Sequence, residues 1–226
     1  MQKLLVQLAV QTAVTIAVMG TFLFAGAGTW RWMQAWIFLA LFAAGSVLAG
    51  AFLLLRDPGL LASRLGGPVQ KGQPLWDRLF LLCTVIGWCL WLALMAADSQ
   101  RWHFSHVPVW LEVAGAVSIA AGFLAVIPVF AANSFASPTV HVQSGQRVID
   151  TGPYAIVRHP MYAGALLHFI GIPLLLGSAY GLIGTALITL AMARRAVGEE
   201  RTLQRELAGY SDYMQRVRWR LIPGVW

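Results

Sequence analysis

Long apolar runs are the feature that most restricts the fold of this chain. Each has about the 20 residues that a helix needs to cross a bilayer core of about 30 Å, or more. None shows the two-residue alternation of a membrane strand, and a bilayer offers the backbone no hydrogen-bond partners, so the runs must be helical. The runs cover residues 4–25, 33–55, 79–97, 109–132 and 160–193.

The last apolar run is too long for one crossing. Residues 160–193 contain no Asp, Glu, Lys or Arg over 34 positions, which is also too short for two full spans and a loop at about 1.5 Å rise per residue. We therefore predict a tight helical hairpin here, and an all-α integral membrane protein with about six transmembrane helices. Four glycines supply the breaks and the small residues that let the two hairpin helices touch: Gly171, Gly177, Gly181 and Gly184.

Composition supports a membrane protein, because only 11% of the residues are charged, against roughly 25% in soluble domains. Gln7, Gln11 and His168 are polar side chains inside the apolar runs. Such side chains bond better to another helix than to lipid. We predict that all three bond to neighbouring helices, with a position facing a cavity as the alternative for His168.

Polar segments join the apolar runs. The segment 56–78 is basic and rich in Gly and Pro, and we interpret it as a loop at the membrane surface, with a loop that covers an active site as the alternative. The segment 133–158 is a polar surface connection. The segment 194–226 holds seven arginines and a helical pattern, so we predict that this C-terminal tail leaves the membrane as a helical segment.

The charge distribution indicates a topology. Six crossings place every Lys and Arg except Arg31 and Arg101 on one side. Basic residues gather on the cytoplasmic side, so we predict that both termini are cytoplasmic. The net charge of +7 then needs no nucleic-acid partner. We interpret residues 1–132 as about four N-terminal spans and residues 133–226 as the motif region, both within one integrated membrane domain.

One short stretch concentrates the chemistry of the chain. It reads Gly152-Pro153-Tyr154 and then Arg158-His159-Pro160. Pro160 restrains His159 to an extended geometry and is tolerated at the first position of a helix. Arg158 and His159 therefore lie at a helix entrance, where unpaired amides and partial positive charge favour an anion. The stretch predicts an anion-binding corner.

This stretch continues into a longer pattern. Arg158-His159-Pro160-x-Tyr162-x-Gly164 is followed by the apolar hairpin, by Glu199-Glu200 and by Tyr210-x-x-Tyr213. In order and spacing the pattern resembles the isoprenylcysteine carboxyl methyltransferase family, in its prokaryotic branch, and its phospholipid methyltransferase relatives. Asn133-Ser134-Phe135 is similar to the polar-aromatic segment that precedes the motif in that family. The likeness covers about the last 95 residues.

The resemblance implies a site for S-adenosyl-L-methionine between the last two membrane helices and the tail. Arg158 and His159 would be catalytic, Arg158 gripping a substrate anion through two bonds and His159 accepting a proton from an amine or thiol. Asn133 and Tyr213, with Arg158, would contact the substrate, and no metal ligands are expected. The residues implied to bind the cofactor are Tyr154, His159, Pro160, Tyr162, Gly164, Glu199 and Glu200.

The resemblance favours methyl transfer to the carboxylate of an isoprenylcysteine-like molecule that enters from the bilayer of a prokaryotic inner membrane. A phospholipid amine or a small thiol as acceptor, and a non-catalytic carrier or assembly protein, are the alternatives. The expected partners are this lipophilic small molecule and membrane lipids, and the oligomeric state is left open. The competing interpretations of the residues themselves are that Arg158 is a membrane-surface anchor and that Glu199 and Glu200 form surface ion pairs.

Overall fold

The computed structural model describes residues 1–67 and 73–226, and part of the predicted surface loop, including Lys71, lies outside the described residues. The described ranges contain helices and no strand. In chain order they are α1 (Gln2–Ala27), α2 (Met33–Arg56), α3 (Pro58–Arg64), α4 (Leu75–Ala97), the π-helical turn η1 (Asp98–Trp102), α5 (Val109–Ala132), the 3-10 turn η2 (Gly152–Ala155), α6 (Pro160–Leu175), α7 (Gly181–Glu206) and α8 (Tyr210–Arg216).

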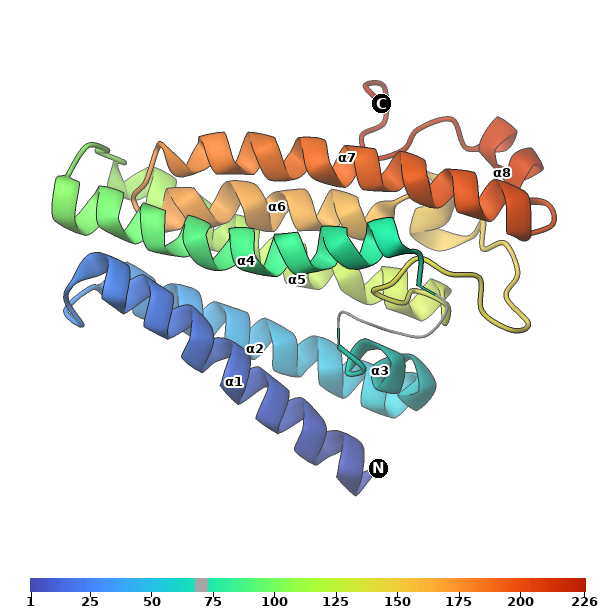
Figure 1. Ribbon diagram of the computed structural model, residues 1–226, viewed down its shortest axis with the longest axis horizontal. Coiled ribbons are helices and arrows are strands. Elements are labelled where there is room, and N and C mark those ends of the chain that lie inside the picture. Colours follow the sequence, from blue (N-terminus) through green and yellow to red (C-terminus); the bar gives the residue numbers. More distant parts are fainter. Residues whose placement is uncertain (68–72) are drawn as a thin grey trace.

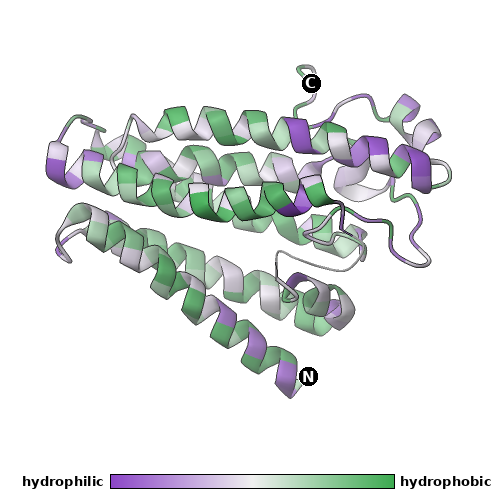
Figure 2. Ribbon diagram, in the orientation of Figure 1, coloured by the Kyte–Doolittle hydropathy of each residue, from purple (hydrophilic) through white to green (hydrophobic). Residues whose placement is uncertain are grey.

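The long helices form an antiparallel membrane bundle. Within the described residues, five helices are long and apolar enough to cross a membrane: α1, α2, α4 with η1, α5 and α7. The predicted sixth crossing corresponds to α6, which is apolar but has only 16 residues. Successive long helices run in opposite directions (Figure 1), and apolar residues dominate their middle parts (Figure 2). The predicted all-α integral membrane fold is confirmed.

The centre of the bundle is a core to which five helices contribute. Five helices, namely α1, α2, α4, α5 and α6, each place a side chain in this core that is 0% exposed. Lipid is as apolar as these side chains, so close van der Waals packing, rather than escape from water, holds the helices together. These residues are Leu23, Phe38, Leu92, Ile119 and Ile172.

Glycines let α6 lie directly against α5. A Cβ atom at Gly171 would lie 2.6 Å from the carbonyl oxygen of Gly115, so neither position has room for a side chain. Gly184 faces α4, where a Cβ would lie 2.3 Å from Nε1 of Trp91. The prediction that these glycines join α6 to α7 is therefore wrong for Gly171 and Gly184, because α6 packs its small residues on α5. The other two predicted glycines lie at the turn between α6 and α7, as expected.

Three local predictions need correction. The helix α7 continues through Arg194 to Glu206, so the tail does not begin as a separate element; at about 1.5 Å per residue α7 is about 39 Å long and exceeds a bilayer core. The surface loop contains α3, and α4 begins four residues before the predicted span. Gln7 and Gln11 are exposed on α1 and form no side-chain hydrogen bond with the described residues, so the predicted bonds to a neighbouring helix are absent.

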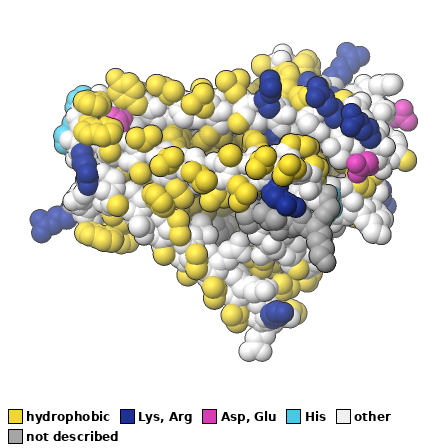
Figure 3. Space-filling view, in the orientation of Figure 1, with side chains coloured by type: hydrophobic (Ala, Val, Ile, Leu, Met, Phe, Trp, Pro, Cys, Tyr) yellow, Lys and Arg dark blue, Asp and Glu magenta, His cyan; other side chains and the backbone are white. Residues whose placement is uncertain are grey.

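The two ends of the bundle differ in charge. Hydrophobic side chains cover the middle of the face shown in Figure 3, and Lys and Arg side chains lie toward its ends. Most of them lie toward the end that carries α3 and α8, and both chain termini lie in that half of the molecule (Figure 1). Arg101 lies at the opposite end, where Nη2 donates to the carbonyl oxygen of Ala25 at 2.8 Å.

Candidate functional site

A polar cavity lies at the basic end of the bundle, among the 133–159 connection, the start of α6, the last turns of α7 and α8. Its lining combines charged and hydrogen-bonding side chains, such as Arg158 and Glu199, with apolar ones, such as Phe135. Eight of the ten residues predicted from the sequence border this cavity, and Gly164 and Glu200 do not. The eight are Asn133, Tyr154, Arg158, His159, Pro160, Tyr162, Glu199 and Tyr213.

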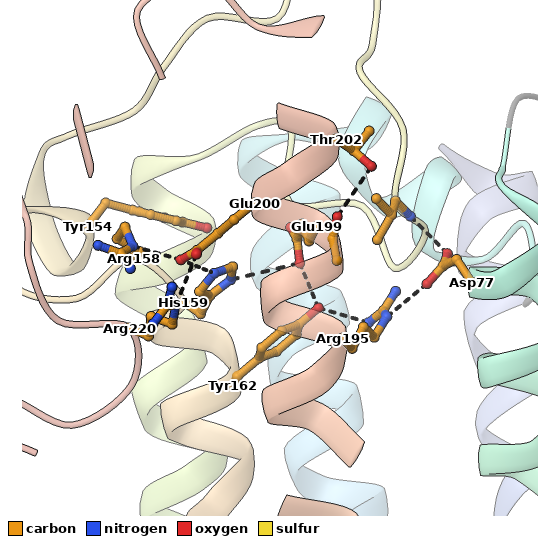
Figure 4. Close-up of polar contacts among 12 residues, drawn as sticks. Asp77, Tyr154, Arg158, His159, Tyr162, Arg195, Glu199, Glu200, Thr202 and Arg220 are labelled. Atoms are coloured by element: carbon orange, nitrogen blue, oxygen red, sulfur yellow. Dashed lines mark hydrogen bonds and ion pairs between the residues drawn. The ribbon is translucent and has the colours of Figure 1, made fainter. Parts of the chain in front are cut away.

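Glu200 lies behind the cavity wall and holds three basic side chains (Figure 4). Its Oε1 atom accepts from Nε of Arg158 at 2.7 Å and lies 3.2 Å from Nε2 of His159, and Oε2 accepts from Nε of Arg220 at 2.9 Å. The residue is only 2% exposed. A buried carboxylate is tolerated when it is fully paired in this way, so Glu200 organises the basic residues beneath the cavity.

Arg158 fastens the C-terminal segment to the entrance of α6. Besides its bond to Glu200, its Nη1 atom donates to the carbonyl oxygens of Val217 at 2.9 Å and Arg218 at 3.1 Å. Among the described residues only Nη2 of this guanidinium has no partner, so it is the nitrogen left for a ligand. Arg158 is 7% exposed, and its interpretation as a membrane-surface anchor is therefore wrong.

Glu199 is the carboxylate that the cavity exposes. Its side chain is 28% exposed, and Oε2 accepts a 2.8 Å hydrogen bond from the hydroxyl of Tyr162. That hydroxyl in turn accepts from Nη1 of Arg195 at 3.0 Å. The rings of His159 and Tyr162 stack at 5.3 Å with an interplanar angle of 7°. Of these two consecutive residues of α7, Glu199 faces the cavity and Glu200 is buried behind its wall. The interpretation of Glu199 and Glu200 as surface ion pairs is therefore wrong.

Asp77 and Arg195 are site residues that the sequence analysis missed. Arg195 donates from Nε to Oδ1 of Asp77 at 2.8 Å and from Nη2 to the carbonyl oxygen of Pro138 at 2.7 Å. The other oxygen of Asp77 accepts from the amide of Val140 at 3.0 Å, and Asp77 is 0% exposed. The end of the segment 56–78, which was predicted to be a loop at the membrane surface, therefore contributes a buried side chain to the network around the site. The only signal was a lone Asp at the start of an apolar run.

Buried tyrosines complete the wall. Nδ2 of Asn133 donates to the hydroxyl of Tyr154 at 2.9 Å, and the hydroxyl of Tyr213 donates to the carbonyl oxygen of Tyr154 at 2.8 Å. Burial raises the pKa of Tyr154 to about 12 and also raises the pKa values of Tyr210 and Tyr213. These hydroxyls are therefore neutral near pH 7 and can donate hydrogen bonds.

Gly164 faces a different space. It lies on α6 against α5, where a Cβ would be 3.6 Å from Cβ of Ala125, an ordinary contact. It borders a second space of about 860 Å³, here called the apolar cavity, which lies among α1, α2, α3, α5 and α6. Met161 borders both the polar and the apolar cavity. A molecule with a polar end and an apolar body would therefore reach both spaces past one side chain.

The comparisons with known proteins agree with this description. Residues 110–208 match the phospholipid methyltransferase family. The chain is also 32% identical over 165 residues to the Delta(14)-sterol reductase TM7SF2 of Mus musculus, a match that covers 70% of this chain and 33% of that protein. The chain thus spans about a third of the length of this curated relative.

The fold and the site define a multi-pass membrane protein with a polar cavity at one end of its helices. Residues 110–208 of the chain match the phospholipid methyltransferase family, a family of membrane methyltransferases that includes the isoprenylcysteine carboxyl methyltransferase-like proteins. The family resemblance inferred from the sequence is thereby confirmed. The matched region contains α5, α6 and α7 with Arg158 and Glu200, and it ends just before α8.

Proposed function

We propose that the protein is a membrane-embedded methyltransferase that uses S-adenosyl-L-methionine and acts on a lipophilic acceptor. One observation supports this most directly: predicted residues from separate segments border a single polar cavity inside the family-matched region. Four of these residues come from the start of α6 and the turn before it: Tyr154, His159, Pro160 and Tyr162. The fifth, Glu199, comes from α7.

The cavity has the chemical groups that S-adenosyl-L-methionine requires. This molecule carries an ammonium group, a carboxylate, ribose hydroxyls, an adenine ring and a sulfonium. The exposed carboxylate of Glu199 suits the ammonium or the ribose hydroxyls, and Arg147 on the cavity wall suits the carboxylate. Phe135 and Tyr210, which also border the cavity, suit the adenine ring. The residues present therefore fit this cofactor.

The residues of the chain would align and shield the reaction. The cofactor supplies a methyl group on a positively charged sulfur. Tyr162 fixes the carboxylate of Glu199, and Glu200 fixes Arg158 and His159, so the groups around the reacting atoms are preorganised. Transfer to an anion neutralises charge, which a site that excludes water favours. A carboxylate acceptor needs no base, whereas an amine or thiol would give its proton to His159.

The acceptor is proposed to be lipophilic because the apolar cavity adjoins the polar one at Met161. Within this class we favour the carboxylate of an isoprenylcysteine-like molecule, which Nη2 of Arg158 would contact. A phospholipid amine or a small thiol is the alternative. The family resemblance favours a prokaryotic inner-membrane protein, and the distribution of basic residues supports a cytoplasmic position of both termini.

A reductase is the second candidate function, because the similarity to a sterol reductase covers 70% of the chain. A reductase needs a hydride donor in the polar cavity in place of a methyl donor. A carrier or assembly protein without catalysis would bind neither donor. The identity of the bound nucleotide therefore separates the three possibilities.

Calorimetric titration of the detergent-purified chain tests the proposal. We expect S-adenosyl-L-methionine and its demethylated product to bind, and NADPH not to bind. Transfer of a tritiated methyl group is then measured into membrane lipid extract and into prenylcysteine, phospholipid amine and thiol acceptors. Binding of NADPH alone would favour the reductase, and binding of neither compound would contradict an enzymatic role for the cavity.

A further inference from the structure

The apolar cavity contains two polar groups that its surroundings do not explain, Arg64 and His168. The cavity lies between the layer formed by α1, α2 and α3 and the layer formed by α5 and α6. Most of its wall is aliphatic or aromatic, as in Leu53, Val126 and Phe130. Polar groups in such an environment are costly unless they find partners.

Arg64 lies at the end of the apolar cavity that adjoins the polar cavity. Its Nη1 atom donates to the carbonyl oxygen of Ala136 at 2.8 Å and lies 3.6 Å from the sulfur of Met161. The guanidinium carbon lies 4.7 Å from the centre of the Phe130 ring. No carboxylate among the described residues pairs with Arg64. It therefore marks the end of the cavity where an anionic head group is favoured.

His168 borders the same cavity further along α6. Its Nε2 atom is buried and has no hydrogen-bond partner among the described residues. Each ring nitrogen of a neutral imidazole either donates or accepts one hydrogen bond, and a hydroxyl can do both, so a hydroxyl group satisfies Nε2 in either tautomer. The prediction that His168 bonds to a neighbouring helix is wrong, and the alternative position at a cavity is correct.

Close packing holds this ring in place. A Cβ atom at Gly122 of α5 would lie 2.5 Å from Cε1 and Nδ1 of His168. The ring of Phe123 meets the imidazole edge to face at 4.5 Å and 89°. Because one edge of the imidazole is fixed against α5 in this way, Nε2 is left as its hydrogen-bonding atom for a molecule in the cavity.

We propose that the apolar cavity holds the body of a hydroxylated lipid with an anionic head, and that Nε2 of His168 forms a hydrogen bond with the hydroxyl of that lipid. The head lies beside Met161, which borders both cavities, with Arg64 on the side of the apolar cavity and the Nη2 atom of Arg158 on the side of the polar cavity. Seven residues separate Met161 from His168 along α6, so the hydroxyl lies about 10 Å from the head. This inference rests on the proposed function, because the lipid is the methyl acceptor, and it adds a specific chemical feature to that acceptor.

A smaller space beside α1 adjoins the apolar cavity. It shares Leu8, Ser46 and Leu65 with that cavity. Gln11 and two threonines of α1 border it. These side chains can hydrogen-bond to a hydroxyl on a lipid chain, whereas an unsubstituted chain gains nothing from them.

Two fatty acids that differ by one hydroxyl test the proposal. 10-Hydroxystearic acid places its hydroxyl about 11 Å from the carboxylate when extended, and stearic acid lacks it. Both are titrated calorimetrically into the full chain in detergent, with S-adenosyl-L-methionine titrated separately. We expect the hydroxy acid to bind about fivefold more tightly, as one net hydrogen bond implies. His168→Phe and His168→Leu should abolish the preference, whereas His168→Gln, which keeps an acceptor, should retain part of it.

His106→Phe is the matched control, because His106 is exposed at the opposite end of the bundle and outside the apolar cavity. It should leave the fivefold preference unchanged. The proposal is overturned if the wild type binds both acids equally or binds neither. It is also overturned if either variant that removes the acceptor retains the preference while still binding S-adenosyl-L-methionine. Loss of S-adenosyl-L-methionine binding in the wild type would instead contradict the proposed function, so the two failures are distinguishable.

Discussion

Nε of Arg158 donates to Oε1 of Glu200 across 2.7 Å, although the two residues are 42 positions apart. The bond joins the entrance of α6 to the last turns of α7. Both residues were predicted to contact ligands. Most of their hydrogen bonds, however, join them to each other and to the C-terminal segment. They form the support of the polar cavity, and this changes what their substitution should do.

Arg158→Lys should destabilise the protein and weaken cofactor binding together. Lysine keeps the charge but cannot reach Glu200 and the carbonyls of Val217 and Arg218 at once. We expect a loss of about 1–3 kcal/mol in unfolding free energy, measured by thermal unfolding in detergent. Arg216→Lys is the control, since Arg216 forms an exposed ion pair with Asp150 and should change little. If Arg158→Lys is as stable as the wild type, the several hydrogen bonds of the guanidinium group are not needed for stability.

Glu199→Gln and Glu200→Gln should separate binding from stability. Glu200→Gln leaves Arg158 and Arg220 without their buried carboxylate, so the fold should lose about 3–5 kcal/mol. Glu199 is partly exposed, so Glu199→Gln should leave the unfolding temperature nearly unchanged and raise the Kd for S-adenosyl-L-methionine about tenfold, as loss of a charged hydrogen bond implies. Calorimetry and thermal unfolding of both variants are the measurements. The reverse pattern would place the ligand-binding carboxylate at Glu200.

Asp77 and Arg195 should prove strongly coupled. Asp77→Asn alone leaves a buried guanidinium without its carboxylate and should cost several kcal/mol. The double variant Asp77→Asn with Arg195→Gln should recover part of that loss, because neither side chain is then charged. A double-mutant cycle on unfolding free energies measures the coupling. Simple additivity would mean that the contact contributes nothing specific.

The contribution of Tyr154 to stability should change with pH only in the alkaline range. Its pKa is raised to about 12 in the folded protein and is about 10 in an unfolded chain. The neutral phenol is favoured by folding, so its contribution is fully present below about pH 10 and is lost as the pH rises toward 12. We expect Tyr154→Phe to lose less stability than the wild type between pH 9 and pH 11. Equal losses in the two proteins would indicate that Tyr154 ionises freely.

The sequence determines the membrane helices well because a bilayer imposes one strong rule. The bounds of α5 and the start of α6 at Pro160 were predicted to the residue, the latter because proline suits a first helical turn. The end of α7 was missed because the prediction used the change from apolar to charged residues at Arg194 as the end of the helix. Charged residues such as Arg and Glu favour a helix as well as apolar ones do, so this change in composition does not end the helix.

The site was predictable in its motif residues and not in their partners. Tyr154, Tyr162 and Glu199 border the cavity as the resemblance implied. Asp77 and Arg195 lie 118 positions apart, and no local pattern records a pairing of that kind. The sequence also does not reveal which neighbouring helix a given residue faces, because this depends on which neighbour has a small residue at the contact, as Gly115 of α5 does opposite Gly171 of α6. Gly164, which was expected beside the cofactor, therefore borders the apolar cavity and not the polar one.

The bonds between the helix entrance and the tail have a consequence for folding. The amides of Arg158 and His159 donate to the carbonyl oxygens of Trp219 and Arg220, both at 2.9 Å. Until this segment folds back over the start of α6, Arg158 lacks the carbonyls of Val217 and Arg218, and Glu200 lacks Arg220. The polar cavity is therefore completed by a segment that follows α7 in the chain, and loosening of this segment would remove partners from buried charges and open the site at the same time.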